Sequence, residues 1–287
     1  MISNTPYARH GILVRIFYLA ISVTYALIRR LWSRRGTTDI VVLCYHGIKP
    51  HQAARFAWQI RRAAGRTIKP RDLTIPRICG RSLPAVCFTF DDGYANLIDN
   101  ALPIMCKHDV PACIFAVTDN MGERPRWQIK PEHPDAGEPL MTAAQLHQAV
   151  RQYMCALGSH TCTHPSLAEI PLSIAIRELE ESRRMLSTIT EQPVEDLALP
   201  HGSFTATVLQ AAQDAGYQRI YTLEPTLHNT ANGRHVIGRF LMSPDAWRIE
   251  FLLTCEGAYR WLYPWRRLLR RLHGRVAHAA NPETVSA

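Results

Sequence analysis

The sequence predicts an α/β fold in which a parallel sheet closes, or nearly closes, into a barrel. Short β-rich runs alternate with helical patterns from residue 39 to about residue 255, as in parallel strands joined by helical crossovers. No Gly-x-Gly-x-x-Gly turn occurs, which disfavours an open dinucleotide-binding sheet. Acidic residues and histidines follow several predicted strands, where β/α barrels carry their chemistry. We therefore expect a single barrel domain of about seven parallel strands.

Charge is distributed unevenly along the 287 residues, which have a formal net charge of +9. Six arginines and no acid lie in residues 1–38, and six arginines and no acid lie in residues 260–276. The positive excess therefore belongs to the two ends of the chain. This distribution argues against a core that binds nucleic acid and indicates ends that contact an anionic surface.

An apolar segment, residues 16–28, lies within the basic N-terminal region 1–38. A spanning helix needs about 20 apolar residues, so this segment is short for one. Arginines follow it in place of a small-residue cleavage site, which disfavours a cleaved signal peptide. We expect an uncleaved anchor or an interfacial helix, with an apolar helix packed on the domain as the alternative. The arginines after the segment favour a cytoplasmic position for the domain that follows.

The central region, residues 39–255, carries the predicted barrel. Strands are predicted at Ile40–Tyr45, Val86–Phe90, Ala112–Val117, Met154–Gly158, Asp196–Leu199, Arg219–Leu223 and Val236–Phe240. Helices are predicted at residues 53–64, 96–108, 142–152, 172–189, 205–215 and 246–254. The polar, proline-rich stretch 119–140 is expected to form a long surface loop that serves as a lid or a substrate rim.

The C-terminal region, residues 256–287, predicts a basic amphipathic helix followed by a tail. Aromatic and aliphatic residues recur at helical spacing between the arginines of residues 260–276. This pattern is typical of a helix that lies at a membrane interface, and a terminal helix docked on the domain is the alternative.

Four residues in two short motifs indicate the chemistry. Asp91 and Asp92 follow one predicted strand, and His160 and His164 follow another at His-x-x-x-His spacing. One aspartate and two histidines form a three-ligand site for a divalent metal with positions left open for water. We predict that the metal ligands are Asp92, His160 and His164, and that Asp91 is a general base that accepts a proton from water. The alternative is that the two aspartates cap a helix.

The eight cysteines include no Cys-x-x-Cys pair, and several lie in strand-like apolar runs. Such cysteines are usually small buried hydrophobic residues, so we expect free thiols in a reducing compartment. Cys162 lies between the two histidines, and we expect it to pack in the core and not to bind metal.

Three motifs together resemble those of the polysaccharide deacetylases, the NodB-homology group of carbohydrate esterase family 4. They are Thr-Phe-Asp-Asp-Gly-Tyr at residues 89–94, Gly-Ser-His-Thr-x-Thr-His-Pro-x-Leu at residues 158–167 and Leu-Pro-His-Gly at residues 199–202. The resemblance covers residues 39 to about 245. It implies a distorted β/α barrel and metal-dependent hydrolysis of the amide of an N-acetylated sugar, with zinc as the usual metal.

The resemblance also implies residue roles. The four residues of the first two motifs match the family's catalytic base and metal ligands, as predicted above. His201 occupies the position of a tyrosine whose backbone N–H helps to hold the oxyanion, and a backbone donor survives this change. Many members pair the base with an arginine at the position of Ala198, and we expect Arg239 to supply that charge instead.

A histidine near the start of the domain completes the expected site. Val-Leu-Cys-Tyr-His-Gly at residues 42–47 resembles the Tyr-His motif of the circularly permuted branch, typified by exopolysaccharide N-deacetylases, in which this strand comes first. His46 then matches the catalytic acid that protonates the departing amine. The alternative is a solvent-facing histidine at the end of a strand.

We therefore expect a metal-dependent hydrolase that removes N-acetyl groups from a polysaccharide or a lipid-linked glycan. Its expected partners are the N-acetylated glycan and a membrane surface, without nucleic acid, and no protein partner can be inferred. One alternative is an amidase or deformylase acting on a non-polymeric substrate, and another is an inactive membrane-anchored binding module. The expected location is the cytoplasmic face of the inner membrane, with anchoring toward the periplasm as the alternative.

Overall fold

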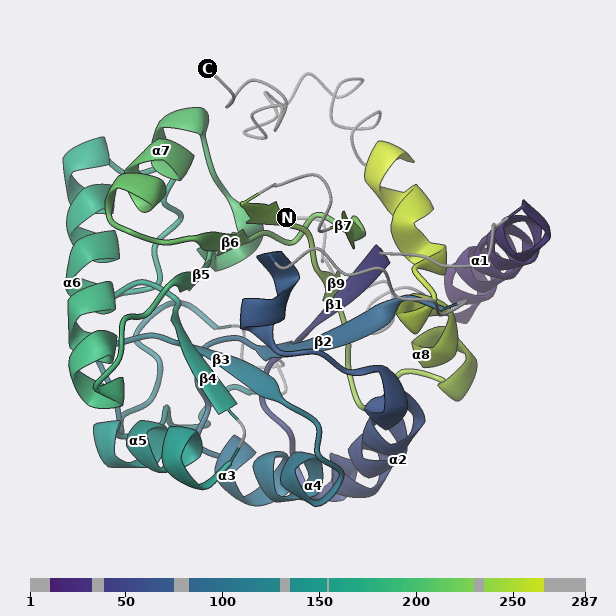
Figure 1. The fold of residues 1–287 in the computed structure, drawn as a ribbon, viewed down its shortest axis with the longest axis horizontal. Coiled ribbons are helices and arrows are strands. Elements are labelled where there is room, and N and C mark those ends of the chain that lie inside the picture. The colour runs from purple at the N-terminus through teal and green to yellow at the C-terminus, as the bar shows by residue number, and fades with distance from the viewer. Residues whose placement is uncertain are drawn as a thin grey trace.

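Seven parallel strands follow one another around a nearly closed barrel in the described part of the computed structural model (Figure 1). The structure describes residues 11–32, 39–74, 83–129, 135–153, 155–229 and 235–265. These seven strands are β1 (Asp39–Tyr45), β2 (Ala85–Phe90), β3 (Ala112–Ala116), β4 (Cys155–Ser159), β5 (Asp196–Ala198), β6 (Arg219–Tyr221) and β8 (Val236–Ile237), and a further short strand, β9 (Phe240–Leu241), runs parallel to β1. The seven are neighbours in the sheet in the same order as in the chain. The predicted α/β barrel of about seven parallel strands is confirmed.

One segment of the chain closes the barrel by pairing with both ends of the parallel series. The sequence predicts a single strand at Val236–Phe240, and this prediction is wrong because the segment divides into β8 and β9 (Phe240–Leu241). β8 pairs with β6, and β9 pairs with β1. Gly238 lies between β8 and β9. A Cβ at this residue would lie 2.0 Å from Thr226 Oγ1 and 2.4 Å from the Glu224 carbonyl oxygen. Only glycine permits this close approach of two backbone segments.

Helices surround the barrel, as Figure 1 shows. The described helices are α1 (Ile12–Trp32), α2 (Ala53–Ala63), α3 (Leu97–Asn100), α4 (Leu102–Lys107), α5 (Ala143–Gln152), α6 (Leu172–Thr190), α7 (Ala206–Asp214) and α8 (Arg248–Cys255). The predicted helix at 96–108 divides into α3 and α4 because Pro103 lacks an N–H and its ring conflicts with the preceding turn. The sequence pattern does not predict the antiparallel strand β7 (His228–Asn229), since two residues show no periodicity.

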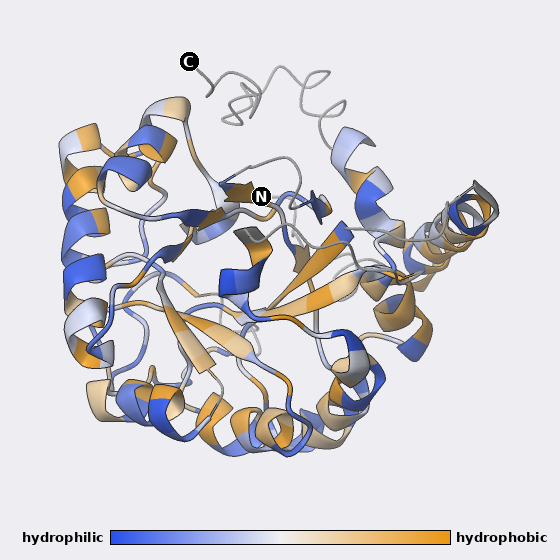
Figure 2. Cartoon of the chain, in the orientation of Figure 1, coloured by the Kyte–Doolittle hydropathy of each residue, from blue (hydrophilic) through white to orange (hydrophobic). Residues whose placement is uncertain are grey.

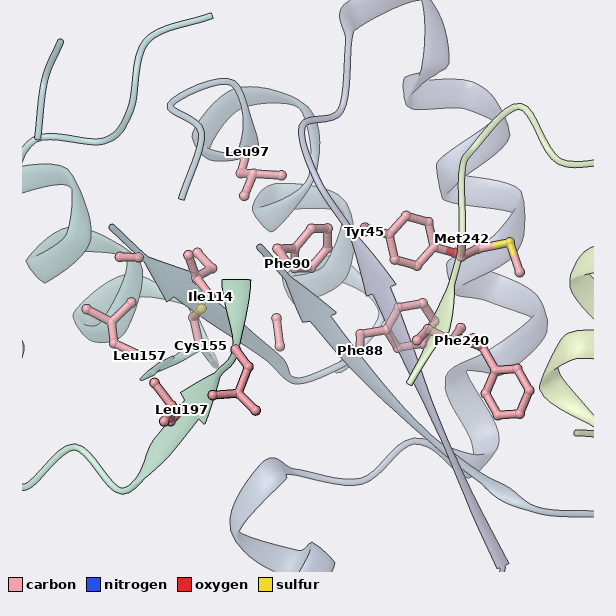
Figure 3. Packing of buried hydrophobic residues seen from close by; sticks show 14 of the residues in the cluster. Tyr45, Phe88, Phe90, Leu97, Ile114, Cys155, Leu157, Leu197, Phe240 and Met242 are labelled. Atoms are coloured by element: carbon pink, nitrogen blue, oxygen red, sulfur yellow. The ribbon is translucent and has the colours of Figure 1, made fainter. Parts of the chain in front are cut away.

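Side-chain alternation along the strands separates two apolar layers. Figure 2 shows hydrophobic residues along the central strands and mixed hydrophobic and hydrophilic residues on the helices. Phe88 and Phe90 belong to the layer between the strands and the helices (Figure 3), whereas Val42 and Cys87 belong to the cluster inside the barrel. Because alternate residues of a strand share a face, Asp91 continues the inward series of Cys87.

Helix α1 contains the predicted apolar segment 16–28 and lies beside α8 at the edge of the barrel (Figure 1). Within the described residues, one helical stretch, Ile12–Arg30, is long and apolar enough to cross a membrane by length and composition. The predicted basic helix at 260–276 overlaps the short helical turn η6 (Ala258–Trp261), and from residue 266 onward it lies outside the described residues. The domain boundaries at residues 38 and 255 stay predictions.

Candidate active site

Asp91 lies at the carboxyl end of the barrel and is paired with Arg239. Asp91 follows β2, and Arg239 lies between β8 and β9, where the barrel closes. Arg239 Nη1 donates to Asp91 Oδ1 at 2.5 Å, and Nη2 donates to Oδ2 at 2.8 Å. Both side chains are buried, and the guanidinium lies 5.3 Å from the centroid of the Phe115 ring. This two-point contact fixes both the position and the direction of the carboxylate.

The charge of Asp91 is set by this pairing. Burial has the largest single effect and raises the pKa of Asp91, but neighbouring groups, chief among them the Arg239 guanidinium, together outweigh burial and hold the pKa well below its usual range. Burial also raises the pKa of the Cys44 thiol, so the thiol keeps its proton and donates to Asp91 Oδ2 at 3.2 Å. We did not predict Cys44 as a site residue. Its inward position in β1, two residues after Val42, is the sequence signal that could have identified it.

Asp92 begins a turn with a left-handed backbone. The φ angles are +68° at Asp92 and +77° at Gly93. If β2 continued as a strand, the side chain of Asp92 would point to the outer face of the barrel, opposite to Asp91. The left-handed turn instead keeps the Asp92 carboxylate at the end of the barrel. Gly93 suits the position because φ is positive and a Cβ would lie 3.3 Å from Ala116 Cα. The buried hydroxyl of Tyr94, whose pKa burial raises, is hydrogen bonded to the Asp92 side chain.

Asp92, His160 and His164 form a candidate metal site. Nε2 of each histidine lies 3.5 Å from Asp92 Oδ1, and one ligand atom from each residue lies within 4.8 Å of the other two. His160 Nδ1 lies 2.8 Å from the Ala198 carbonyl oxygen. A carbonyl only accepts, so Nδ1 carries the proton and Nε2 presents its lone pair to the cluster. Burial lowers the pKa of His164, which favours a neutral imidazole.

The donor set fits a divalent cation. A carboxylate and two neutral imidazoles are usual ligands of zinc at sites that leave room for water. All three residues are buried, and His164 Nδ1 has no hydrogen-bond partner among the described residues. Buried lone pairs that face one another are costly unless a donor or a cation satisfies them. The residues therefore fit the metal that the sequence predicts.

The loop between the two histidines is held by a buried glutamate of α6. Thr161 and His164 have φ angles of +68° and +63°, so the spacing belongs to a tight loop and not to a helical turn. Glu178 accepts hydrogen bonds from Cys162 N at 2.7 Å, Thr163 N at 2.9 Å and Thr163 Oγ1 at 2.6 Å. Cys162 packs in the interior, as expected. We did not predict Glu178, because an acid within a charged helix carries no pattern of its own.

Two aromatic rings flank His164. His201, in the turn that follows β5, has a φ of +59°, and its ring centroid lies 4.7 Å from that of His164. Trp127 lies in the proline-rich loop and stacks on His164 at 4.4 Å between ring centroids. The sequence gives no signal for Trp127, since one aromatic residue in a polar loop has no periodicity. The loop predicted as a lid or rim therefore reaches the metal site.

His46 directly follows β1 at the same end of the barrel. Since β1 and β2 pair in parallel with Tyr45 opposite Phe90, His46 and Asp91 follow neighbouring strands at the same level. The structure thus brings all the predicted site residues to one end of the barrel, namely His46, Asp91, Asp92, His160, His164, His201 and Arg239.

Residues 81–220, which include all three motifs, match the family model described as polysaccharide deacetylase. Residues 81–220 are thus similar in sequence to the polysaccharide deacetylases. The match confirms the family resemblance and the hydrolase class that the motifs indicate.

Curated relatives match the chain at low identity. YxkH of Bacillus subtilis, named as a polysaccharide deacetylase, is 26% identical over 159 residues, which cover 55% of this chain and 52% of that protein. The poly-beta-1,6-N-acetyl-D-glucosamine N-deacetylase of Staphylococcus epidermidis is 24% identical over 170 residues, which cover 56% of each. The chain therefore spans about half the length of the curated relatives it matches.

Solved structures share the barrel fold of the chain. IcaB from Ammonifex degensii matches with a TM-score of 0.62 and 24% identity over 76% of this chain and 97% of that one. The Streptococcus pyogenes deacetylase PplD matches with a TM-score of 0.61 and 23% identity over 76% of this chain and 98% of that one. At these identities the likeness concerns the fold, and it agrees with the predicted barrel.

Replacing Glu178 with alanine is expected to weaken the affinity of the protein for added zinc, used as the probe cation, about 10- to 100-fold. The loss of three accepted hydrogen bonds releases the loop that positions both histidines. Competition with a chromophoric chelator measures the affinity. Glu181→Ala, which alters an exposed side chain of the same helix, is the control. Equal zinc affinity of the E178A and E181A variants would show that Glu178 does not position the ligands.

The metal-free protein is expected to lose stability as the pH falls below about 6.5. Burial lowers the pKa of His164, so below that pH the unfolded chain binds more protons than the folded chain. The free energy of unfolding then falls by about 1.4 kcal/mol per pH unit until the pH reaches the folded pKa. His201, whose pKa burial also lowers, adds less because water screens it.

Urea unfolding of EDTA-treated protein between about pH 7.5 and 5.5 checks this slope, and His164→Asn is expected to flatten it. A free energy of unfolding that stays constant over this range would contradict the burial of a neutral His164.

Proposed function

We propose that the deacetylase domain removes N-acetyl groups from an N-acetylated sugar of a polysaccharide or a lipid-linked glycan, with zinc as its metal. One observation carries the proposal: Asp91, a carboxylate fixed by the buried Arg239, stands directly beside the ligand cluster of Asp92 and two histidines. A base next to a three-ligand metal site is the arrangement that amide hydrolysis requires. The Staphylococcus epidermidis relative is named for such a reaction on poly-beta-1,6-N-acetyl-D-glucosamine.

Asp92, His160 and His164 would hold the cation, which when bound supplies a Lewis acid for the acetyl carbonyl and for water. Asp91 accepts a proton from the attacking water. The low pKa of Asp91 makes its carboxylate a weak base. The pairing with Arg239 therefore fixes the orientation of this carboxylate at the expense of its basicity.

The remaining roles concern the oxyanion and the leaving group. His46 donates a proton to the nitrogen of the departing amine, which would otherwise leave as a poor anion. The backbone N–H of His201 donates to the oxyanion of the tetrahedral intermediate. The hydrogen bonds from Gly202 N to the Leu199 carbonyl at 2.9 Å and from Ser203 N to the Pro200 carbonyl at 3.2 Å fix this turn. The products are acetate and an amino sugar.

A substrate panel tests the proposed reaction. The full chain is incubated with β-1,6-linked N-acetylglucosamine oligomers, with their N-formyl analogues and with a lactam, and the released acid and free amine are measured. Acetate release that stops on chelation and returns with zinc is expected. Turnover of only the N-formyl or lactam substrates would favour an amidase or deformylase. No turnover of any substrate by zinc-loaded protein would favour a binding module.

The proposed location is the cytoplasmic face of the inner membrane. The seven described cysteines are free, six of them buried, which fits a reducing compartment. The arginines that follow the apolar segment favour the same side, because the cytoplasmic leaflet is rich in anionic lipid. A C-terminal fusion to a reporter that is active only in the periplasm is expected to be silent. An active reporter would place the domain outside the cytoplasm and make exported polysaccharide the better substrate.

A further inference from the structure

Helix α1 packs on the domain with one side and leaves a second, apolar side exposed. The packed side combines core contacts of Leu19, Val23 and Ala26 with several polar contacts. The large hydrophobic side chains with the greatest exposure on α1 have exposed fractions between 49% and 79%, and they are Ile12, Leu13, Ile16, Phe17, Leu27 and Ile28. An exposed apolar side of this length marks an interaction surface for an apolar partner outside the domain.

The first half of α1 is held by buried polar contacts. Arg15 donates through Nε and Nη2 to the two carboxylate oxygens of Glu250, a residue only 1% exposed. The guanidinium also lies 4.0 Å from the centroid of the Trp247 ring. Ser22 lies about two turns after Arg15 on α1. Its buried hydroxyl accepts a hydrogen bond from the indole N–H of Trp261 at 2.9 Å.

The last turn of α1 is held in the same way. Arg29 donates to the Glu256 carbonyl oxygen at 2.5 Å and to the Asp39 carboxylate at 2.7 Å. Arg30 donates to the Glu256 carboxylate at 2.5 Å. The contacts therefore extend from Arg15 to Arg30, and α1 lies along the flank of the domain over nearly its whole length.

A membrane-spanning position of α1 is incompatible with these contacts. Arg15 would then lie among lipid chains, where a charged side chain is costly. Glu250 would stay behind as a buried carboxylate without its partner, which is strongly destabilising.

We infer that α1 lies in the plane of an anionic lipid bilayer, with its exposed apolar side inserted at the interface and its other side bound to the domain. Charge selects this partner: three of the six arginines of region 1–38 pair with acids of the domain, and the other three, Arg9, Arg34 and Arg35, flank the helix in the sequence and complement anionic headgroups. A second copy packed through α1 would offer these three arginines no acid from its own region 1–38. The inference concerns how the domain is held at the membrane and does not depend on the reaction proposed above.

The test measures binding of the full chain to sedimented vesicles. Vesicles of phosphatidylglycerol and phosphatidylcholine are expected to bind it, and vesicles of phosphatidylcholine alone more weakly. The double variant L13D/F17D is expected to lose at least about tenfold in vesicle affinity, since two inserted side chains become charged. Ile174→Asp, on the exposed surface of α6, is the matched control and is expected to bind normally. Deacetylation of a soluble oligosaccharide by each variant, measured in parallel, separates a failure of binding from a failure of catalysis.

Three results would overturn the inference. Equal vesicle binding by L13D/F17D and the unaltered chain would show that the apolar side does not insert. A dimer that forms without vesicles and that L13D/F17D dissociates would make a second copy the partner. Retention in membranes after alkaline carbonate treatment, which releases proteins held only at the interface, would show that α1 spans the bilayer.

Discussion

Asp91→Asn is expected to lower kcat/KM for deacetylation by about 10²- to 10⁴-fold while the bound metal stays near one equivalent. Asparagine keeps the shape of the side chain but cannot accept a proton from water. The three proposed metal ligands, with the Ala198 carbonyl and Glu178 that position two of them, are untouched by the change. Steady-state kinetics and metal analysis of the same preparation provide the two readouts.

Two further variants separate the roles around Asp91. His46→Gln is expected to lower kcat/KM with full metal content, because it removes the proposed acid and no ligand. Asp92→Asn is expected to lower both activity and metal content. Asp91→Asn protein that loses its metal, or that keeps its activity within about tenfold, would contradict the assignment of Asp91 as the base.

Arg239→Met is expected to destabilise the protein by about 3–5 kcal/mol and to remove most of its activity. The substitution leaves Asp91 as a buried carboxylate without its main partner. The reduced neighbouring charge also raises the pKa of Asp91 from its present low range. Urea unfolding measures the stability, and acetate release measures the activity.

The double variant D91N/R239M distinguishes the structural from the catalytic part of this pair. It removes both charges, so much of the stability lost in R239M is expected to return, whereas activity is not. Stability of R239M within about 1 kcal/mol of the unaltered chain would show that the Arg239 pair does not offset the burial of Asp91.

The parallel strands could be predicted because each is a short apolar run that ends at a polar residue. That pattern places Asp91, His46 and His160 at the same end of the barrel before any coordinates are known. The division of Val236–Phe240 could not be predicted, because it depends on the approach of residues 224–226 to Gly238. Tertiary contact, and not local propensity, decides where that strand breaks.

The ligand residues were readable from the sequence, whereas the residues that support them were not. Asp92, His160 and His164 belong to short local motifs. Glu178 reaches the histidine loop from a separate helix, and Trp127 reaches it from a long loop. Such supporting contacts join distant segments, so they appear only once the fold brings those segments together.

A zinc titration of metal-free protein most directly tests whether the cluster of Asp92, His160 and His164 drives deacetylation. Acetate release from an N-acetylglucosamine oligomer is measured as zinc is added to EDTA-treated, dialysed protein. The predicted result is a rise in rate that reaches its plateau at about one equivalent of zinc and that is lost in the Asp92→Asn variant. Acetate release that continues unchanged without metal, or that needs zinc but survives Asp92→Asn, would contradict a metal-dependent deacetylase at this site.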